Sequence, residues 1–214
     1  TSNYVVQGFT AEVPEPELAK IAHQGNVPFV VDLGSGTLVD LTQFGLPKEP
    51  TPAEAIAHGA DLVTFSCDKL LGGPQAGILV GRKDLIQRVK KNPLKRVLRV
   101  GKVTLAGLES VLRMYRNPGA LPERVKVIQL LTRPASAMQA QAEALIPSLR
   151  ESLAGCGLSI DAQSVKSQIG SGSLPVERLP SVALAISAVD RTHEKKVVRL
   201  ERILRGSDIA VIGR

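Results

Sequence analysis

A chain of 214 residues is long enough to form one large domain or two small ones. It is 43% hydrophobic and 22% charged, and no apolar run approaches the roughly 18 residues of a membrane-spanning helix, so we expect no membrane partner. Aromatic residues make up 3% with no tryptophan, which argues against a base-stacking surface for single-stranded nucleic acid.

The net charge of +7 is concentrated in one stretch, residues 82–102, which we call the basic segment. It holds nine basic residues and one acidic residue, Asp84, a local charge of +8 that leaves about −1 for the rest of the chain. Such a surface suits the binding of phosphate groups.

Cysteine usage and the chain ends bear on the setting of the protein. Cys67 and Cys156 form neither a metal-binding spacing nor a disulfide framework, and no leader-like segment is present, so we expect a cytoplasmic protein. The chain begins at Thr1 without methionine and stops just after the apolar run IAVIG. We therefore expect a piece of a longer protein.

Helices and strands alternate in the first half of the chain. The pattern predicts a helix over 15–24 that ends at Gly25, a buried strand in NVPFVVDLGSG, a helix from Pro52 with Thr51 as N-cap, and a strand over 62–65. This alternation favours a mostly parallel sheet covered by helices. AGILVG predicts another strand, which should turn back on its predecessor because GGPQ is too short for a crossover.

Helices dominate the middle of the chain. RKDLIQRVKKN predicts a helix, Asn92 and Pro93 start a second in LKRVLRV, and TLAGLESVLRMY predicts a third. NPGALPE indicates a break before a long helix at about 135–153.

A small α+β layer is predicted beyond Gly155, from the segment SIDAQSV, the loop GSGSLP, the strand SVALAISAV, the helix HEKKVVRLERILRG and the strand IAVIG. We expect a large domain over 1–117, connecting helices over 118–155 and a small domain over 156–214, with a soft boundary within 117–134.

Nucleotide and metal motifs are not supported. Gly34 and Gly36 give G-x-G without the third glycine of a dinucleotide fingerprint, and no phosphate-binding G-x-x-x-x-G-K-[ST] occurs. The three histidines lie far apart on predicted amphipathic helices, so no metal site is predicted.

One lysine, Lys69 in FSCDKLLGGPQAG, stands at a position typical of ligand binding. It follows a predicted buried strand, at the sheet edge where open α/β folds bind ligands. Ser66 adds a hydroxyl, Asp68 a carboxylate, and Gly72 and Gly73 could offer N–H groups to a phosphate. The alternative is an ordinary solvated loop lysine.

An acid, Asp32, ends the apolar strand before the glycine loop. A buried carboxylate is costly unless a cation or donors answer it, so a partner is implied. One candidate partner is the backbone of Gly34 and Ser35 in an Asx turn. The other is the ring nitrogen of pyridoxal phosphate, which a carboxylate keeps protonated. Strand-end Asp, a second strand and then Lys is the order that such enzymes use.

Five stretches together resemble the bacterial selenocysteine synthases, the L-seryl-tRNA(Sec) selenium transferases: SNYVVQGFT, VVDLGSGTLVDLTQFGLPKEPTP, LVTFSCDKLLGGPQAGILVGRKDLI, PLKRVLRVGKVTLAGLE and SQIGSGSLPVERLPS. The resemblance implies an α/β fold. The chain would be part of a fold-type-I pyridoxal-phosphate transferase large domain followed by a small α+β domain, both truncated. A tRNA-recruiting N-terminal domain would be missing.

The resemblance also implies roles for single residues. Lys69 would be the Schiff-base lysine, Asp32 the partner of the pyridinium nitrogen, and Asp68 an aid to catalysis. Arg96 and Arg99 would hold the phosphate of selenophosphate, in agreement with their i, i+3 spacing, which would put both guanidinium groups on one helical face. Their alternatives are a solvated basic face or a surface that meets the tRNA backbone.

The implied reaction is β-elimination of the serine hydroxyl of seryl-tRNA(Sec) with pyridoxal 5'-phosphate, followed by addition of selenium from selenophosphate. The implied assembly is a homo-oligomer with shared active sites and no DNA partner. The excised chain should show little or no activity. Cys67, where a glycine is expected, is either a packing residue or a reactive thiol.

Two other functions stay open. One is a pyridoxal-phosphate lyase for a small molecule, such as an ammonia lyase for a phosphorylated amino sugar acid, with the arginines on the substrate phosphate. The other is a non-catalytic module whose basic segment binds RNA.

Overall fold

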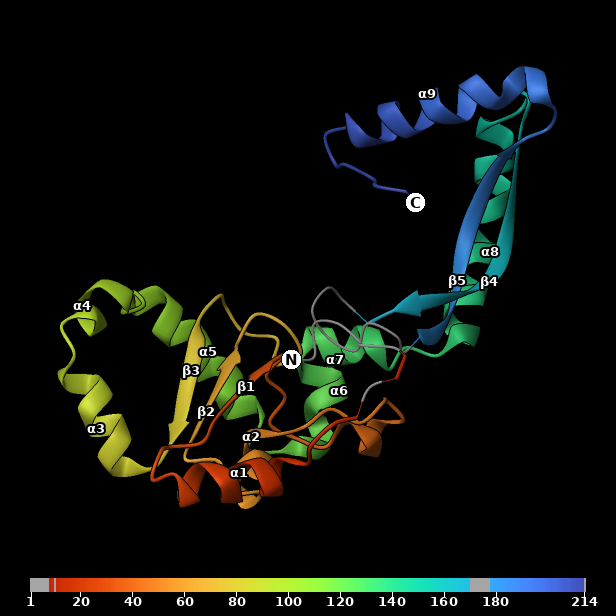
Figure 1. Cartoon of the computed structure of the whole chain (residues 1–214). Helices are drawn as coiled ribbons and strands as arrows, with labels where there is room; N and C mark the ends of the chain where they lie inside the picture. The colour runs from red at the N-terminus through yellow and green to blue at the C-terminus, as the bar shows by residue number, and fades with distance from the viewer. Residues whose placement is uncertain (1–7, 10, 170–177, 214) are drawn as a thin grey trace. The chain divides into compact units, whose positions relative to one another are not determined.

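The computed structural model describes residues 8–9, 11–169 and 178–213 (Figure 1). The chain forms two compact units: residues 1–132 with 168–178, and residues 133–167 with 179–214. The architecture is mixed α/β with small sheets. Among the described helices, none combines the length and hydropathy that a bilayer crossing requires.

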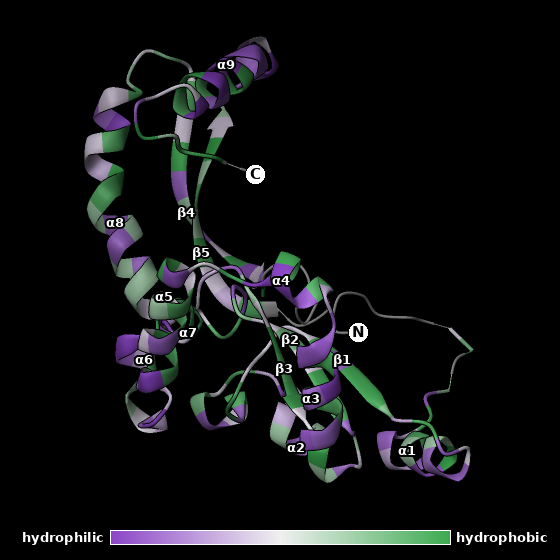
Figure 2. Ribbon diagram, turned by 90° about the vertical axis from the view of Figure 1, so that its left-hand side faces the viewer, coloured by the Kyte–Doolittle hydropathy of each residue, from purple (hydrophilic) through white to green (hydrophobic). Residues whose placement is uncertain are grey.

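A three-stranded sheet forms the centre of the first unit, in the order β1 (Val30–Gly34), β2 (Leu62–Ser66), β3 (Gly77–Gly81). β1 and β2 are parallel, with Asp32 opposite Thr64. β3 runs antiparallel to β2, which confirms that the chain turns back after the Lys69 region. Figure 2 shows hydrophobic residues along β1 and β3, as expected of strands that pack on a core.

The helices of the first unit begin where the sequence predicts. They are α1 (Glu15–Gln24), α2 (Pro52–Ala57), α3 (Lys83–Lys91), α4 (Leu94–Leu98) and α5 (Lys102–Met114), with a 3-10 turn η1 (Leu41–Phe44) between β1 and α2. Thr51 caps α2 through a reciprocal capping box with Glu54, and its hydroxyl accepts from the Glu54 N–H at 3.2 Å. The carboxamide oxygen of Asn92 accepts from the Leu94 N–H at 2.9 Å and so starts α4.

The predicted break after α5 contains three short helical elements: η2 (Pro118–Ala120), α6 (Leu121–Arg124) and α7 (Lys126–Leu131). Their buried side chains Leu121, Val125 and Ile128 join Cys67 and Leu71 in one hydrophobic cluster. Residues 118–131 therefore pack in the core of the first unit, while the long helix after them belongs to the second.

A second hydrophobic cluster lies between the sheet and α2. It consists of Leu33, Ala55, Ala60, Val63 and Phe65. Strand side chains alternate between the two faces of a sheet, so Leu33 turns toward this cluster and Asp32 toward the other face.

The second unit consists of α8 (Ala135–Ser152), β4 (Leu158–Gln168), β5 (Arg178–Ala188), η3 (Arg191–His193) and α9 (Glu194–Arg205), and β4 pairs with β5. The predicted loop GSGSLP lies outside the described residues. The predicted strand IAVIG is wrong: residues 209–213 form no strand, and Ile209 is 84% exposed. A strand needs a neighbour for its N–H and C=O groups, and no described strand pairs with this segment.

Candidate active site

Lys69 lies on a short loop, residues 67–73, which we call the Lys69 loop. It follows β2 directly and is closed by main-chain hydrogen bonds. The Gly73 N–H donates to the Cys67 carbonyl at 2.7 Å, the Gly72 N–H to the Lys69 carbonyl at 3.0 Å, and the Cys67 N–H to the Ala76 carbonyl at 2.9 Å. The backbone thus fixes the position of Lys69.

The glycine pair serves the closure of this loop. Gly72 has φ +74°, and a Cβ there would lie 2.8 Å from Val125 Cγ1, so a side chain would be strained and would clash. The N–H groups of Gly72 and Gly73 are both engaged inside the loop. The expectation that they are offered to a phosphate is therefore wrong, because closing so tight a turn uses both donors.

Tyr115, the residue just after α5, hydrogen-bonds to the Lys69 loop. Its buried hydroxyl lies 3.1 Å from the Leu71 carbonyl and 3.3 Å from the Leu70 carbonyl, to which it donates. Burial raises the pKa of Tyr115 well above its ordinary value, so the hydroxyl keeps its proton. Tyr115 is a functional residue that the sequence did not predict, because its burial depends on packing against the Lys69 loop.

The side chains around Lys69 differ in exposure. Lys69 is half-buried, and within the described part of the chain its Nζ makes no hydrogen bond or ion pair. Asp68 is exposed, and the hydroxyl of Ser66, the last residue of β2, has no partner among the described residues. The amine is therefore available to a ligand.

Cys67 is a packing residue. Its side chain is fully buried in the cluster with Leu71 and Tyr115. Burial raises the pKa of the Cys67 thiol, and the negative charge of Asp68 adds to the effect, so the reactive thiolate is disfavoured.

Asp32 lies in β1 directly opposite Thr64 of β2, and its Oδ1 accepts from Thr64 Oγ1 at 2.9 Å. The side chain is exposed, so the expectation of a buried carboxylate is wrong: Asp32 points to the face away from Leu33 and its cluster. Its partner is the threonine across the strands rather than the turn. Since β1 and β2 are parallel, Asp32 and the Lys69 loop lie toward the same edge of the sheet.

The turn after β1 packs against the start of the Lys69 loop. Gly36 has φ +70°, and a Cβ there would overlap the carbonyl oxygen of Ser66, so only glycine fits. The Ser35 carbonyl accepts from the Leu70 N–H at 3.2 Å. Two segments that are distant in sequence are thereby joined at the site.

Arg96 lies in α4 and Arg99 is the C-cap residue of that helix. α4 is only five residues long and ends at Leu98, and Arg99 has extended backbone angles (φ −67°, ψ 136°). The paired grip of these two guanidinium groups on one anion stays a prediction. Both side chains are exposed, and neither guanidinium has an acidic partner among the described residues, so both stay available to an anion.

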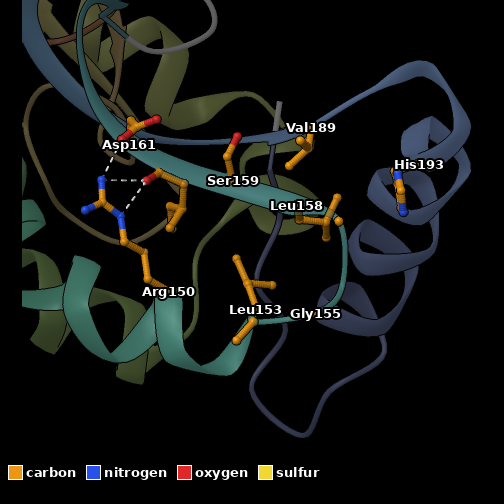
Figure 3. A pocket seen from close by; sticks show the side chains of 11 residues that line it. Arg150, Leu153, Gly155, Leu158, Ser159, Asp161, Val189 and His193 are labelled. Atoms are coloured by element: carbon orange, nitrogen blue, oxygen red, sulfur yellow. Dashed lines mark hydrogen bonds and ion pairs between the residues drawn. The ribbon is translucent and has the colours of Figure 1, made fainter.

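A separate hollow of about 610 Å³ lies in the second unit, lined by residues of α8, the loop after it, β4 and η3, together with Val189 (Figure 3). Arg150 pairs there with Asp161 at 2.7 Å. None of the predicted site residues lies in it. No group of three or more metal-ligating side chains occurs in the described part of the chain.

The residues at the sheet edge fit pyridoxal phosphate in part. Lys69 supplies a free amine, and Asp32 supplies a carboxylate whose Oδ2 has no partner among the described residues. The phosphate would need donors other than the N–H groups of Gly72 and Gly73. The described residues thus offer an amine for the Schiff base and a carboxylate for the ring nitrogen.

Comparison with known proteins points in one direction. Residues 1–214 match the model of the family described as SelA, L-seryl-tRNA selenium transferase. The L-seryl-tRNA(Sec) selenium transferase of Klebsiella pneumoniae (strain 342) is 52% identical over 217 residues, which is 100% of this chain and 46% of the relative. That of Serratia proteamaculans (strain 568) is 55% identical over 89% of this chain and 41% of the relative.

A solved structure shares the fold. The structure titled D-Glucosaminate-6-phosphate Ammonia-lyase aligns with the whole chain and 47% of its own chain, with a TM-score of 0.57 and 20% sequence identity. The chain thus spans less than half the length of the proteins it matches. Because the family model covers the chain from end to end, the chain belongs to the L-seryl-tRNA selenium transferase family.

Proposed function

We propose that the full-length protein containing this chain converts seryl-tRNA(Sec) to selenocysteinyl-tRNA(Sec) with pyridoxal 5'-phosphate and selenophosphate. The observation that carries the proposal is the free amine of Lys69, held at the edge of the sheet by a backbone-closed loop, in a chain that this family matches over its whole length.

Lys69 and Asp32 would divide the work at the cofactor. Lys69 would bond the cofactor and, once the substrate amine displaces it, take the proton from Cα of the serine. Asp32 would hold the proton on the ring nitrogen through Oδ2, while Thr64 fixes the carboxylate through Oδ1. When bound, the cofactor supplies the electron-withdrawing ring that stabilises the carbanion. Asp68 would assist catalysis, and the hydroxyl of Ser66 would help to bind the cofactor.

The basic segment would hold the phosphate of the selenium donor. Arg96 and Arg99 are exposed and free of acidic partners in the described structure, so their donors remain for an oxyanion. Arg96 would reach the anion from α4 and Arg99 from the C-cap of the same helix, three residues further on.

The rest of the site would come from outside this chain. Its length, under half that of its relatives, suits a fragment of a fold-type-I large domain (1–117), connecting helices (118–155) and part of a small domain (156–214). We propose a cytoplasmic homo-oligomer with shared active sites, in which the excised chain alone is inactive.

A pyridoxal-phosphate lyase for a phosphorylated amino sugar acid is the second candidate. The fold likeness to a D-glucosaminate-6-phosphate ammonia-lyase favours it, but at 20% identity that likeness concerns the fold alone. Both candidates use Lys69 and Asp32 and differ in the substrate.

The first test is labelling of the full-length protein. Borohydride reduction with pyridoxal phosphate and peptide mapping should place the label on Lys69, and Lys69→Ala should lose the visible cofactor band. Lys83→Ala, at an exposed lysine of α3, is the matched control and should keep both.

The second test separates the candidates. Selenocysteinyl-tRNA formation from seryl-tRNA(Sec) and selenophosphate supports the transferase, whereas ammonia release from D-glucosaminate 6-phosphate supports the lyase. Absence of the band and of the label in the wild type would reject both and leave the RNA-binding module.

A further inference from the structure

Glu49, in the loop between η1 and α2, is a buried carboxylate for which the proposed reaction has no use. Its side chain is 1% exposed. Burying a carboxylate is costly unless donors answer it. The hydroxyl of Ser35, which is itself fully buried, donates a hydrogen bond to this carboxylate.

The surrounding loop does not explain why Glu49 is there. The cap of α2 is already complete, since Thr51 and Glu54 bond each other reciprocally. Lys48, the neighbouring cation, pairs with Asp40 and Glu54. Among the described residues, Ser35 is thus the one hydrogen-bond partner of Glu49.

Ser35 connects Glu49 to the Lys69 loop. While its hydroxyl donates to Glu49, its carbonyl accepts from the Leu70 N–H at 3.2 Å, next to Lys69. The Ser35 N–H donates to the Leu33 carbonyl at 2.8 Å, so both sides of the residue are fixed. Gly36, beside it, packs on the Ser66 carbonyl. A continuous hydrogen-bonded path leads from Glu49 through Ser35 to Leu70.

We propose that Glu49 is a positioning residue for Lys69. By holding the hydroxyl of Ser35, it fixes the direction of the Ser35 carbonyl and, through the Leu70 N–H, the orientation of the Lys69 loop. The bond to the Ser35 hydroxyl and the bond to its carbonyl each restrict the conformation of this residue, and both lie in a buried setting. The inference rests on the proposed function, in which Lys69 bonds the cofactor.

The acceptor atom, rather than the charge, is the feature that this role requires. Glu49→Gln keeps an Oε1 acceptor of the same reach, whereas Glu49→Ala removes the acceptor and Ser35→Ala removes the donor. Thr51→Ala is the matched control: Thr51 is also buried, but it bonds Glu54 and not the Lys69 loop.

The experiment uses the full-length protein with pyridoxal phosphate. Two readouts report on Lys69: the rate at which borohydride fixes the label on it, and the pH midpoint of the cofactor absorbance band. Melting temperature is measured in parallel. We expect Glu49→Ala and Ser35→Ala to slow labelling about tenfold and shift the midpoint, Glu49→Gln to stay close to wild type, and Thr51→Ala to lower only the melting temperature.

Labelling rates and midpoints equal to wild type in both alanine variants would overturn the inference and leave Glu49 a structural residue. If the alanine variants do not fold, Glu49→Asp, which withdraws the acceptor by one methylene, takes their place with the same readouts. Absence of label on Lys69 in the wild type would instead reject the proposed function, so the two failures are distinguishable.

Discussion

The buried side chain of Tyr115 stabilises the Lys69 loop. The Tyr115 hydroxyl satisfies the carbonyls at the end of the Lys69 loop, where water has no access. A buried carbonyl that loses its donor costs more than the bond itself contributed. The support of Lys69 therefore depends on a residue 46 positions further along the chain, which is what links the site to α5.

Tyr115→Phe should destabilise the full-length protein by about 1–2 kcal/mol, because it removes the donor and leaves two buried carbonyls underbonded. Urea unfolding followed by circular dichroism measures the change. Ser110→Ala, which removes an exposed hydroxyl bonded within α5, is the control and should change stability by less than about 0.5 kcal/mol.

Asp61 gives the fold a specific response to acid. Its buried carboxylate accepts from Arg82 and from the Phe29 N–H, with His23 as a further partner, and these bonds lower its pKa to about 2. Because the pKa of Asp61 is lower in the folded than in the unfolded protein, its ionised carboxylate stabilises the fold at a pH above the unfolded-state pKa of 3.8. This contribution is lost as the pH falls from about 4 toward 2.

Asp61→Asn should therefore reduce the loss of melting temperature between pH 4.5 and 2.5, in roughly the window that the two pKa values define. The check is thermal unfolding of both proteins across that range. Equal pH slopes for wild type and variant would refute the assignment. Asp84→Asn is the control, at an exposed acid that also pairs with Arg82.

At the scale of elements, the position of Lys69 depends on the Lys69 loop, the turn after β1 and the C-terminal end of α5. The Lys69 loop crosses α6 and α7 at Gly72, where no side chain has room. The turn after β1 meets the end of β2 at Gly36 in the same way. At both places the main chain lies so close to its neighbour that only glycine, which has no Cβ, fits.

Gly72→Ala should cost about 1–3 kcal/mol, because alanine is strained at φ +74° and its Cβ would meet Val125. It should also slow labelling of Lys69, since the loop must shift. Gly77→Ala is the matched control: a Cβ there meets nothing and φ lies in the ordinary range. Thermal unfolding and peptide mapping of the label measure the two effects.

The basic segment is also understood at this scale, as two short helices and the start of a third. Arg96→Ala and Arg99→Ala should each raise the KM for selenophosphate several-fold, as loss of a charge-assisted bond predicts, with a smaller effect on kcat. Arg113→Ala is the control, because Arg113 already pairs with Glu109. Unchanged KM in both variants would remove these arginines from the donor site.

Across the whole molecule, local signals in the sequence predicted the order of elements well. The cap at Thr51, the start of α4 at Asn92 and the antiparallel return of β3 all depend on residues close together in sequence, and all are confirmed. Chain length between strands was enough to exclude a crossover.

Most of what failed depends on distant contacts. The exposure of Asp32 follows from which face of the sheet packs on α2. The engagement of the Gly72 and Gly73 N–H groups is local, but it depends on the conformation in which the loop closes, which residue types alone do not specify. The IAVIG segment has strand composition but no described neighbour. Glu49, flanked by Lys48 and Pro50, has nothing in its local sequence to indicate burial.

The closure of the Lys69 loop by its own backbone has a consequence for substitutions in the loop. The main-chain bonds that close the loop need no particular side chain at Cys67 or Lys69, whereas the fit of the loop requires glycine at position 72. Substitution of Lys69 by another residue should therefore leave the backbone of the loop in place and remove only the amine.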